Sequence, residues 1–158
     1  MNFNLKTEIN QIIFSLTSLV ESKGNKIKLQ SNLNSNYEVY SDVAKIHQLF
    51  YNIVGNANKF TENGLISITI NPDDSSDYEL NLKVEIKDNG IGIPENDLEN
   101  IFESYYQGTI SGNVNDLGVG LGLNLCKEII ELFDGEITVE SKEGEGTNVI
   151  FNLILSKV

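Results

Sequence analysis

The stretch QLFYNIVGNANKF, residues 48–60, predicts a helix on which a polar row borders the buried face. Asn52, Asn56 and Lys59 follow one another at spacings that place them within about 60° of one another on a helix. Apolar residues fill the adjoining arc, which is typical of a helix packed on a core. Two amide oxygens and an ammonium group at such an edge suit a metal ion and its anionic ligand. The alternative is a helix whose asparagines simply face water, and one motif does not separate the two.

The composition indicates one globular domain with a substantial core. The chain has 158 residues, of which 40% are hydrophobic and 22% are charged. No segment has the length of a membrane span or the layout of a secretory signal. The net charge of −12 argues against nucleic acid or an anionic membrane surface as a partner, because both attract basic proteins. We therefore expect a single domain over residues 1–158, with no direct membrane contact.

The residue types available for metal binding are restricted. Cys126 and His47 are the single cysteine and the single histidine, which excludes an internal disulfide and disfavours a transition-metal site. Because the chain is so acidic, a polyphosphate ligand would have to arrive with its own divalent cation. Mg²⁺ often takes only one or two protein oxygens together with phosphate and water. A magnesium site therefore does not require a cluster of carboxylates.

The order of helical and strand patterns predicts an α+β fold. Helical spacing predicts helices over residues 5–22, from the cap Asp42 to residues 63–64, over 95–104 and over 121–133. Alternation predicts a strand beginning at residue 27 and further strands over residues 37–40, 65–70, 80–87, 136–141 and 147–155. Paired strands and grouped helices favour a two-layer α/β sandwich. Its sheet is expected to be mixed, mostly antiparallel, and covered on one face by about three helices.

A second motif, DNGIGIP at residues 88–94, directly follows a predicted strand. Asn-Gly between apolar residues is typical of a hairpin turn, which is the alternative interpretation. Here, however, the motif leads into a predicted helix and not into a return strand. Gly90 and Gly92 permit a close approach of the backbone to a planar ligand. Asp88 would then accept a hydrogen bond from an exocyclic amine.

A third motif, GVGLGL at residues 118–123, stands at the start of a predicted helix. Glycines there expose N–H groups to an anion, and the helix dipole favours negative charge at the same end. The spacing is not that of the dinucleotide motif, and a flexible hinge is the alternative. Between the two glycine motifs lie IFESYYQ, residues 101–107, and the glycine-rich residues 108–117. The glycine-rich residues 108–117 are expected to form a mobile lid that orders over a ligand.

Taken together, the motifs resemble a known family. NIVGNANKF, DNGIGIP, IFESYYQ and GVGLGL resemble, in order and spacing, the N box, first glycine box, F box and second glycine box of sensor histidine kinases. The closing DGEITVESKEGEGT is similar to the terminal hairpin of their catalytic ATP-binding domain. The resemblance covers nearly the whole chain. It implies the Bergerat fold, an α/β sandwich shared with the DNA gyrase B subunit and the heat-shock chaperone ATPases.

The resemblance also implies ligands and roles at the phosphate end of a bound ATP. Asn56 would ligate Mg²⁺ with the help of Asn52, and Lys59 would contact phosphate; these three form the predicted catalytic set. The phosphates would be cradled by the third motif, through its glycines and the N–H groups beside them: Gly118, Gly120, Leu121, Gly122 and Leu123.

At the adenine end, the resemblance implies that Asp88 binds the amino group and that Phe60 packs beside the ring. The pocket would be shaped by residues of the second motif, namely Gly90, Gly92 and Ile93. Thr147, which follows the Gly-Glu-Gly turn, would support Asp88 through a water molecule.

The residue at position 52 favours a kinase over an ATPase. An attacking water needs a base, and the gyrase-like relatives place a glutamate one turn before the metal-binding asparagine. Here that position is Asn52, whose amide cannot act as a base. Phosphoryl transfer is mostly positioning and charge neutralisation, so we expect the terminal phosphate of Mg-ATP to pass to an external histidine. That histidine is not His47, which lies across the apolar arc from Asn52.

The resemblance places the phosphoacceptor histidine on a helical hairpin of the same parent protein, absent from this chain, with residues 1–4 a remnant of the linker. The expected function is phosphate donation in two-component signal transduction, with a response regulator as an indirect partner. The domain is expected to be a cytoplasmic monomer, and its parent a membrane-anchored sensor. Two alternatives stay open: a non-catalytic nucleotide-sensing module, and a serine kinase of the anti-sigma type. Asn52 argues against the serine kinase, because a serine hydroxyl benefits from deprotonation.

Overall fold

The helices form where apolar side chains recur at helical spacing. The structure is a computed structural model that describes residues 1–103 and 118–158, without the side chains of residues 118–122. Its helices are α1 (Leu5–Ser22), α2 (Val43–Lys59), the one-turn α3 (Glu95–Leu98) and α4 (Gly118–Leu132). Asn4 caps α1 by accepting a 3.0 Å hydrogen bond from the N–H of Thr7, and Asp42 caps α2 by accepting from Lys45 at 3.2 Å. Among the described residues, no helix combines the length and the hydrophobicity needed to cross a bilayer.

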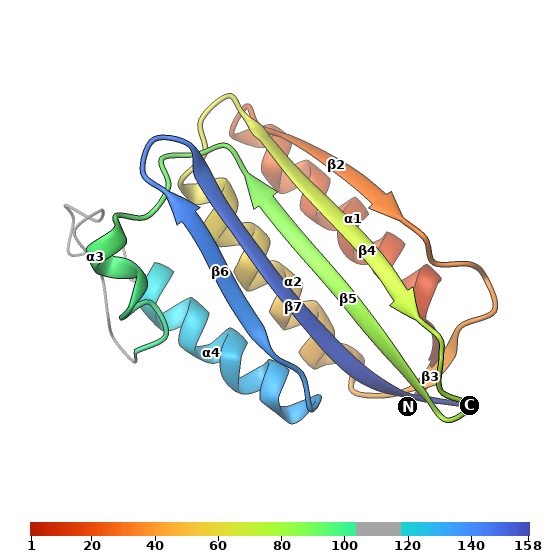
Figure 1. The fold of residues 1–158 in the computed structure, drawn as a ribbon. Helices are drawn as coiled ribbons and strands as arrows, with labels where there is room; N and C mark the ends of the chain where they lie inside the picture. Colours follow the sequence, from red (N-terminus) through yellow and green to blue (C-terminus); the bar gives the residue numbers. More distant parts are fainter. Residues whose placement is uncertain (104–117) are drawn as a thin grey trace.

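The strands form one mixed sheet. They are β1 (Asn2–Asn4), β2 (Lys26–Ser31), β3 (Glu38–Tyr40), β4 (Leu65–Asp73), β5 (Glu79–Asp88), β6 (Ile137–Lys142) and β7 (Gly146–Lys157). In the described residues the order is β1-β3-β7-β5-β4-β2, with β6 also paired to β7. The pairing of β2 with β4 is parallel and the others are antiparallel. Figure 1 shows α1, α2 and α4 side by side on one face of this sheet.

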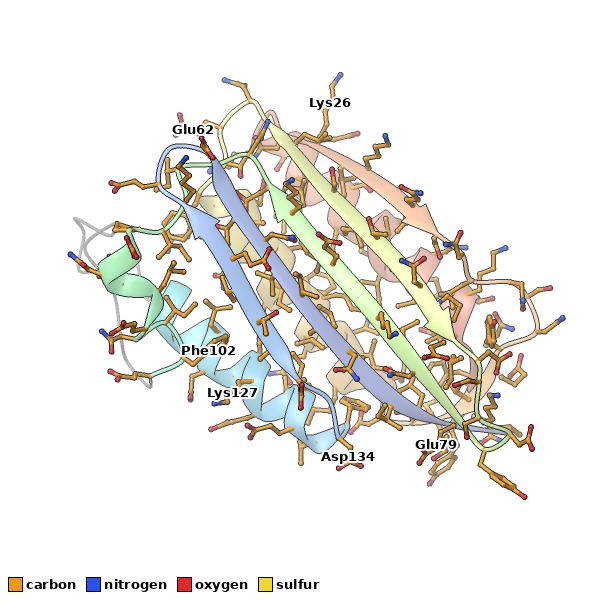
Figure 2. The ribbon with its side chains drawn as sticks, viewed as in Figure 1. Lys26, Glu62, Glu79, Phe102, Lys127 and Asp134 are labelled. Atoms are coloured by element: carbon orange, nitrogen blue, oxygen red, sulfur yellow. The ribbon has the colours of Figure 1, made fainter. Side chains whose placement is uncertain are left out.

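The core lies between that sheet face and the helices. Alternate residues of the central strands point inward and are buried, as are the apolar stripes of α1, α2 and α4. Phe50 of α2 meets Phe151 of β7 edge to face, with ring centres 6.0 Å apart. The other face of the sheet carries polar side chains, seen toward the viewer in Figure 2. The predicted two-layer sandwich is therefore confirmed.

Several predicted boundaries were wrong, each for a local reason. The second helix ends at Lys59, before residues 63–64, because the chain turns there toward β4 and Asn63 takes a positive φ of 49°. The last helix begins at Gly118 and not at residue 121, so the glycines of the third motif lie in its first turns. The helix expected over residues 95–104 is the single turn α3. The expected lid, residues 108–117, lies outside the described residues.

One strand was missed. Residues 1–4 were expected to be a linker remnant, yet Asn2–Asn4 pair with β3 as strand β1. Three residues are too short for an alternation signal, and the pairing is made across the fold. Both termini of the chain lie at this end of the sheet (Figure 1).

Candidate functional site

A pocket opens where α2, β5, β7 and the first turns of α4 meet. We call it the α2–β5 pocket, and its empty volume is about 490 Å³ including the space at its mouth. Its lining residues come from four elements and the two loops that follow α2 and β5: Ile53, Asn56, Ala57, Phe60, Ile86, Asp88, Gly92, Ile93, Leu123, Thr147 and Val149. The fold thus brings together residues from all three motifs and from the closing hairpin.

The walls of the α2–β5 pocket are mostly apolar. Ile53 of α2, Ile86 of β5 and Val149 of β7 present buried aliphatic side chains to it. Asp88 is the carboxylate among its lining residues and stands at the end of β5. An apolar slot with one polar anchor is the usual form of a site for a flat heteroaromatic ring. The aliphatic wall residues were not among the predicted site residues, since their spacing resembles that of any core position.

Asp88 is a buried carboxylate held by backbone donors. It is 7% exposed, and its Oδ1 accepts a 2.9 Å hydrogen bond from the N–H of Gly90. Burial raises the pKa of Asp88 above its ordinary value, while the N–H groups of Gly90 and Thr147 lower the pKa, as does the Thr61 hydroxyl. The Thr61 hydroxyl faces the carboxylate without a hydrogen bond of regular geometry. The net effect is a carboxylate whose charge is costly in the unliganded protein.

The pKa of Asp88 leads to a testable pH dependence. Because the folded-state pKa lies above the unfolded value of 3.8, the folded chain binds more protons between the two values. The free energy of unfolding contributed by Asp88 therefore falls as the pH rises from below 3.8 through the folded pKa. We expect the free energy of unfolding of Asp88→Asn minus that of the unsubstituted chain to be larger at pH 7 than at pH 3.5.

Urea unfolding of the two chains across this pH range measures the difference. The other carboxylates titrate in both chains, so their contributions largely cancel. A stability difference that does not change with pH, or that changes in the opposite sense, would contradict the raised pKa.

Gly90 and Gly92 are required for packing of the chain against itself. A Cβ atom at Gly90 would collide with the carbonyl oxygen of Phe60, and one at Gly92 would collide with that of Lys142. Gly92 also has a positive φ of 71°. The loop between them is fixed on both sides, since Ile91 donates to the Phe60 carbonyl at 3.1 Å and accepts from Gly144 at 2.7 Å. The predicted close approach of the backbone exists, but its partners are α2 and the β6–β7 turn.

A hydroxyl pair joins the second motif to the closing hairpin. The Ser141 hydroxyl accepts a 2.8 Å hydrogen bond from the N–H of Ile93 and donates to the Gly146 carbonyl at 2.9 Å. Thr147 Oγ1 lies 2.8 Å from the same Ser141 oxygen, while the Thr147 N–H donates a hydrogen bond to the Asp88 carboxylate. Sequence reasoning missed Ser141 and Thr61. Strand alternation, which puts residues 141 and 147 opposite each other across the turn, was the available signal for Ser141.

The polar row of α2 is half-buried and partly unsatisfied. The amide nitrogens of Asn52 and Asn56 are shielded from solvent and have no hydrogen-bond partner among the described residues. Buried polar groups are normally paired, so an unpaired one calls for an explanation. A half-turn of either amide exchanges its nitrogen for its oxygen, the ligand atom that Mg²⁺ prefers. The two side chains therefore fit a hydrated divalent cation that also binds phosphate.

Other predicted residues lie around the α2–β5 pocket without lining it. Lys59 is half-buried, and its ammonium stands 5.6 Å from the centre of the Phe60 ring, on a neighbouring shallow depression. Asn52 is one turn of α2 before Asn56 and outside the pocket lining. The glycines of the third motif lie in the first turns of α4, where N–H groups lack helical acceptors. Leu123 of the same helix reaches the pocket.

A small cluster ties α4 to the second motif. Leu123 packs with Ile93 and Ile101, apart from the main core. Beside it, the Lys127 ammonium of α4 lies 5.7 Å from the centre of the Phe102 ring (Figure 2). Phe102 is partly buried against this cluster. These contacts hold the start of α4 next to the loop that leads out of Asp88.

Comparison with known proteins gives consistent matches. A family model described as "Histidine kinase-, DNA gyrase B-, and HSP90-like ATPase" matches residues 41–157. Over 149 residues the chain is 35% identical to the hybrid signal transduction histidine kinase L of Dictyostelium discoideum. Over 153 residues it is 31% identical to the signal transduction histidine-protein kinase BarA of Escherichia coli. The structure is similar to the nucleotide-free catalytic domain of histidine kinase ThkA, with a TM-score of 0.74 and 28% identity.

The coverage of these matches is unequal. The two curated relatives match 92% and 97% of this chain, which spans only 9% and 17% of their length. The ThkA match covers 97% of this chain and 93% of that domain.

Proposed function

Since this chain belongs to the histidine kinase-, DNA gyrase B- and HSP90-like ATPase family, we propose that it binds ATP with Mg²⁺ in the α2–β5 pocket and donates the terminal phosphate to a histidine of a separate acceptor hairpin. The observation that carries this proposal is the pairing of two features in one site. A buried carboxylate, Asp88, ends an apolar slot that Asn56 also lines, with Asn52 one turn of α2 away. The amide nitrogens of both asparagines have no hydrogen-bond partner among the described residues.

The adenine is proposed to lie in the apolar slot. Ile86 and Val149 on the sheet side and Phe60 at the end of α2 supply surfaces for the ring. Asp88 would accept a hydrogen bond from the exocyclic amine, which restores part of the solvation that the carboxylate lost on burial. The backbone donors of Gly90 and Thr147 hold that carboxylate in place. Recognition by a preset acceptor explains why a group with a costly charge is kept there.

The phosphates are proposed to extend along α2 toward the start of α4. Asn56, with Asn52 behind it, would hold Mg²⁺, which when bound neutralises phosphate charge. Lys59 would contact the phosphates only after its side chain turns from the Phe60 ring. The N–H groups of the first turn of α4, which have no acceptor within the helix itself, would provide anion-binding donors. This arrangement would balance part of the repulsion between the phosphates and a chain of net charge −12.

Transfer to an external nucleophile is favoured by the groups near Asn56. Asn52 occupies the position one turn before it and cannot deprotonate water, whereas an imidazole brings its own lone pair. His47 does not meet this need, because its Nε2 lies 3.2 Å from a Glu8 carboxylate oxygen on the α1 side of α2. We therefore propose that the nucleophile comes from the acceptor hairpin of the parent protein.

The biological setting is part of the same proposal. The domain would act in the cytoplasm, where ATP is available, as a monomeric catalytic part of a larger membrane-anchored sensor. The phosphate would pass from the acceptor histidine to a response regulator. The single domain over residues 1–158 is proposed as one functional unit.

Calorimetric titration with a non-hydrolysable ATP analogue, with and without Mg²⁺, tests the binding half of the proposal. We expect saturable binding that strengthens with the metal. Labelled ATP then tests transfer: the chain alone should label itself negligibly, and the acceptor hairpin of the parent should become labelled when it is added. Binding without transfer would contradict the kinase proposal in favour of a nucleotide-sensing module. Labelling of a serine in a partner would favour the anti-sigma-type serine kinase, and no binding would overturn the whole proposal.

A further inference from the structure

We propose that the turn between α1 and β2, residues 23–25, positions the adenine wall of the α2–β5 pocket. Lys23 and Asn25 are inferred to be positioning residues that hold the end of α2 against the second motif. This inference rests on the proposed function, because it concerns ATP affinity at that site. The turn precedes residues 41–157, the part of the chain that the family model matches.

Asn25 is a buried connector between three segments. It is 1% exposed, and its Nδ2 donates to Asn58 Oδ1 and to the Thr61 carbonyl, each at 2.8 Å. Its Oδ1 accepts a 2.9 Å hydrogen bond from the N–H of Gly64. Asn58 is itself only 8% exposed. One side chain thus satisfies groups at the end of α2 and at the entry to β4, in a place where water does not compete.

Lys23 closes the carboxyl end of α2 from the same turn. Its Nζ donates to the carbonyls of Asn58, Lys59 and Thr61 at 2.7, 2.6 and 3.1 Å. The last carbonyls of a helix have no helical donor, and a cation there also complements the helix dipole. The ammonium therefore fixes the direction in which the chain leaves α2.

The segment held in this way is a wall of the α2–β5 pocket. Phe60, between the carbonyls bound by Lys23, lines the pocket, and its own carbonyl accepts from the N–H of Ile91 at 3.1 Å. Thr61, whose carbonyl Asn25 binds, directs its hydroxyl toward Asp88. Hydrogen bonds thus run from the α1–β2 turn to the backbone on both sides of Phe60, and the Thr61 hydroxyl faces Asp88 without a hydrogen bond of regular geometry.

Loss of the hydrogen bonds made by the Lys23 or Asn25 side chain should weaken ATP binding without removing any group proposed to contact ATP. Phe60 and Asp88 should already be held in their binding positions before adenine binds, because ordering them during binding lowers affinity. Substitutions along a coupled chain of this kind typically change affinity by about 3- to 30-fold. We expect Asn25→Ala to weaken ATP binding within that range, measured by calorimetry at a temperature where circular dichroism shows the variant to be folded.

Asn4→Ala is the matched control for Asn25→Ala. Asn4→Ala removes the cap hydrogen bonds at the amino end of α1, the end opposite the α1–β2 turn, so it lowers stability at a distance from the pocket. We expect an unchanged dissociation constant for ATP in this variant. Equal weakening of binding in both variants would show that Asn25 acts only through general stability, and unchanged binding in both would show that Asn25 has no effect on affinity. Either result would overturn the proposal.

Lys23→Met keeps the inference testable if Asn25→Ala does not fold. Methionine keeps the apolar stem but removes the ammonium from the three carbonyls. Lys26→Met is its control, because Lys26 is an exposed lysine at the same end of the molecule (Figure 2), and its loss changes the net charge equally. We expect weaker ATP binding for Lys23→Met than for Lys26→Met at matched ionic strength. Equal affinities would overturn the role of Lys23.

A double-mutant cycle separates positioning from a merely structural role. If residue 25 acts through the adenine wall, its effect on ATP affinity should shrink in an Asp88→Ala background, because the contact that it positions is gone. Additive effects would contradict the proposal. Absence of ATP binding by the unsubstituted chain would instead contradict the proposed function, so the two failures are distinguishable.

Discussion

Asn56→Ala is expected to abolish magnesium-dependent ATP binding while leaving the fold intact. Loss of groups that merely orient metal ligands costs about 10- to 100-fold in metal affinity, so loss of a direct ligand should cost at least about 100-fold in the affinity for Mg-ATP. Titrations with the ATP analogue should show little difference between the presence and absence of Mg²⁺ in this variant.

The stability of Asn56→Ala makes this prediction sharper. The Asn56 amide nitrogen has no hydrogen-bond partner among the described residues, so truncation breaks no bond that the structure shows for it. Alanine also has a better helix propensity than asparagine, by about 0.5 kcal/mol. We expect an unchanged or slightly higher free energy of unfolding in urea. A residue kept at the expense of stability is typical of a functional site.

Asn10→Ala provides the matched control for Asn56→Ala. Asn10 is an exposed asparagine of α1, so the same chemical change is made on a helix surface away from the α2–β5 pocket. Its titrations should match those of the unsubstituted chain. Magnesium-dependent binding that persists in Asn56→Ala would remove Asn56 from the proposed metal site.

Asp88→Ala is expected to reduce the preference for ATP over GTP by about 10- to 100-fold, the equivalent of one hydrogen bond to a charged group. The carboxylate would accept from the amine of adenine, but it would face the carbonyl oxygen of guanine and repel it. Dissociation constants for the two nucleotides, measured with Mg²⁺ on the same preparation, give the ratio. Taking the ratio cancels any general loss of affinity that comes from the freed N–H groups of Gly90 and Thr147.

Asp73→Ala is the control for the change in charge. Asp73 is a carboxylate at the far end of β4, paired with Lys83 at 3.6 Å and remote from the α2–β5 pocket. It should leave the nucleotide preference unchanged. A preference that survives in Asp88→Ala would show that another group selects the base.

Much of the fold was predictable because local and global signals agree in this chain. Helix α1 has the predicted bounds, since apolar spacing and the cap Asn4 act within the segment itself. The antiparallel neighbours β4 and β5 follow from alternation and a short connection. The errors fall where a tertiary contact decides, as at the end of α2, where the side chains of Lys23 and Asn25 bind the last carbonyls. Strand β1 likewise exists only through its pairing with β3.

The predicted site shows the same division. Asn56, Asp88 and Thr147 were singled out from motifs, and the fold places all three on one pocket. Their proposed roles toward ATP and Mg²⁺ stay predictions. The predicted role of Gly90 and Gly92 toward a ligand also stays a prediction. The structure adds a second requirement for glycine there, because the carbonyls of Phe60 and Lys142 leave no room for a Cβ atom. Ser141 could have been found from strand alternation, which sets it opposite Thr147 across the closing turn. Asn25 carried no motif, and its place beside the site follows from the tertiary structure.

Motif order and residue spacing were enough to identify the family and the layered fold, and to single out the groups proposed to meet an adenine and a phosphate. These follow from spacing, because period and motif order are properties of the chain alone. The tertiary structure decided which groups surround Asp88, how deeply it is buried, and which distant turn holds the end of α2. Burial and hydrogen-bond partners depend on segments far apart in the chain, and so does the free energy needed to ionise a buried carboxyl group. The raised pKa of Asp88 therefore belongs to the folded molecule and to no single stretch of its sequence.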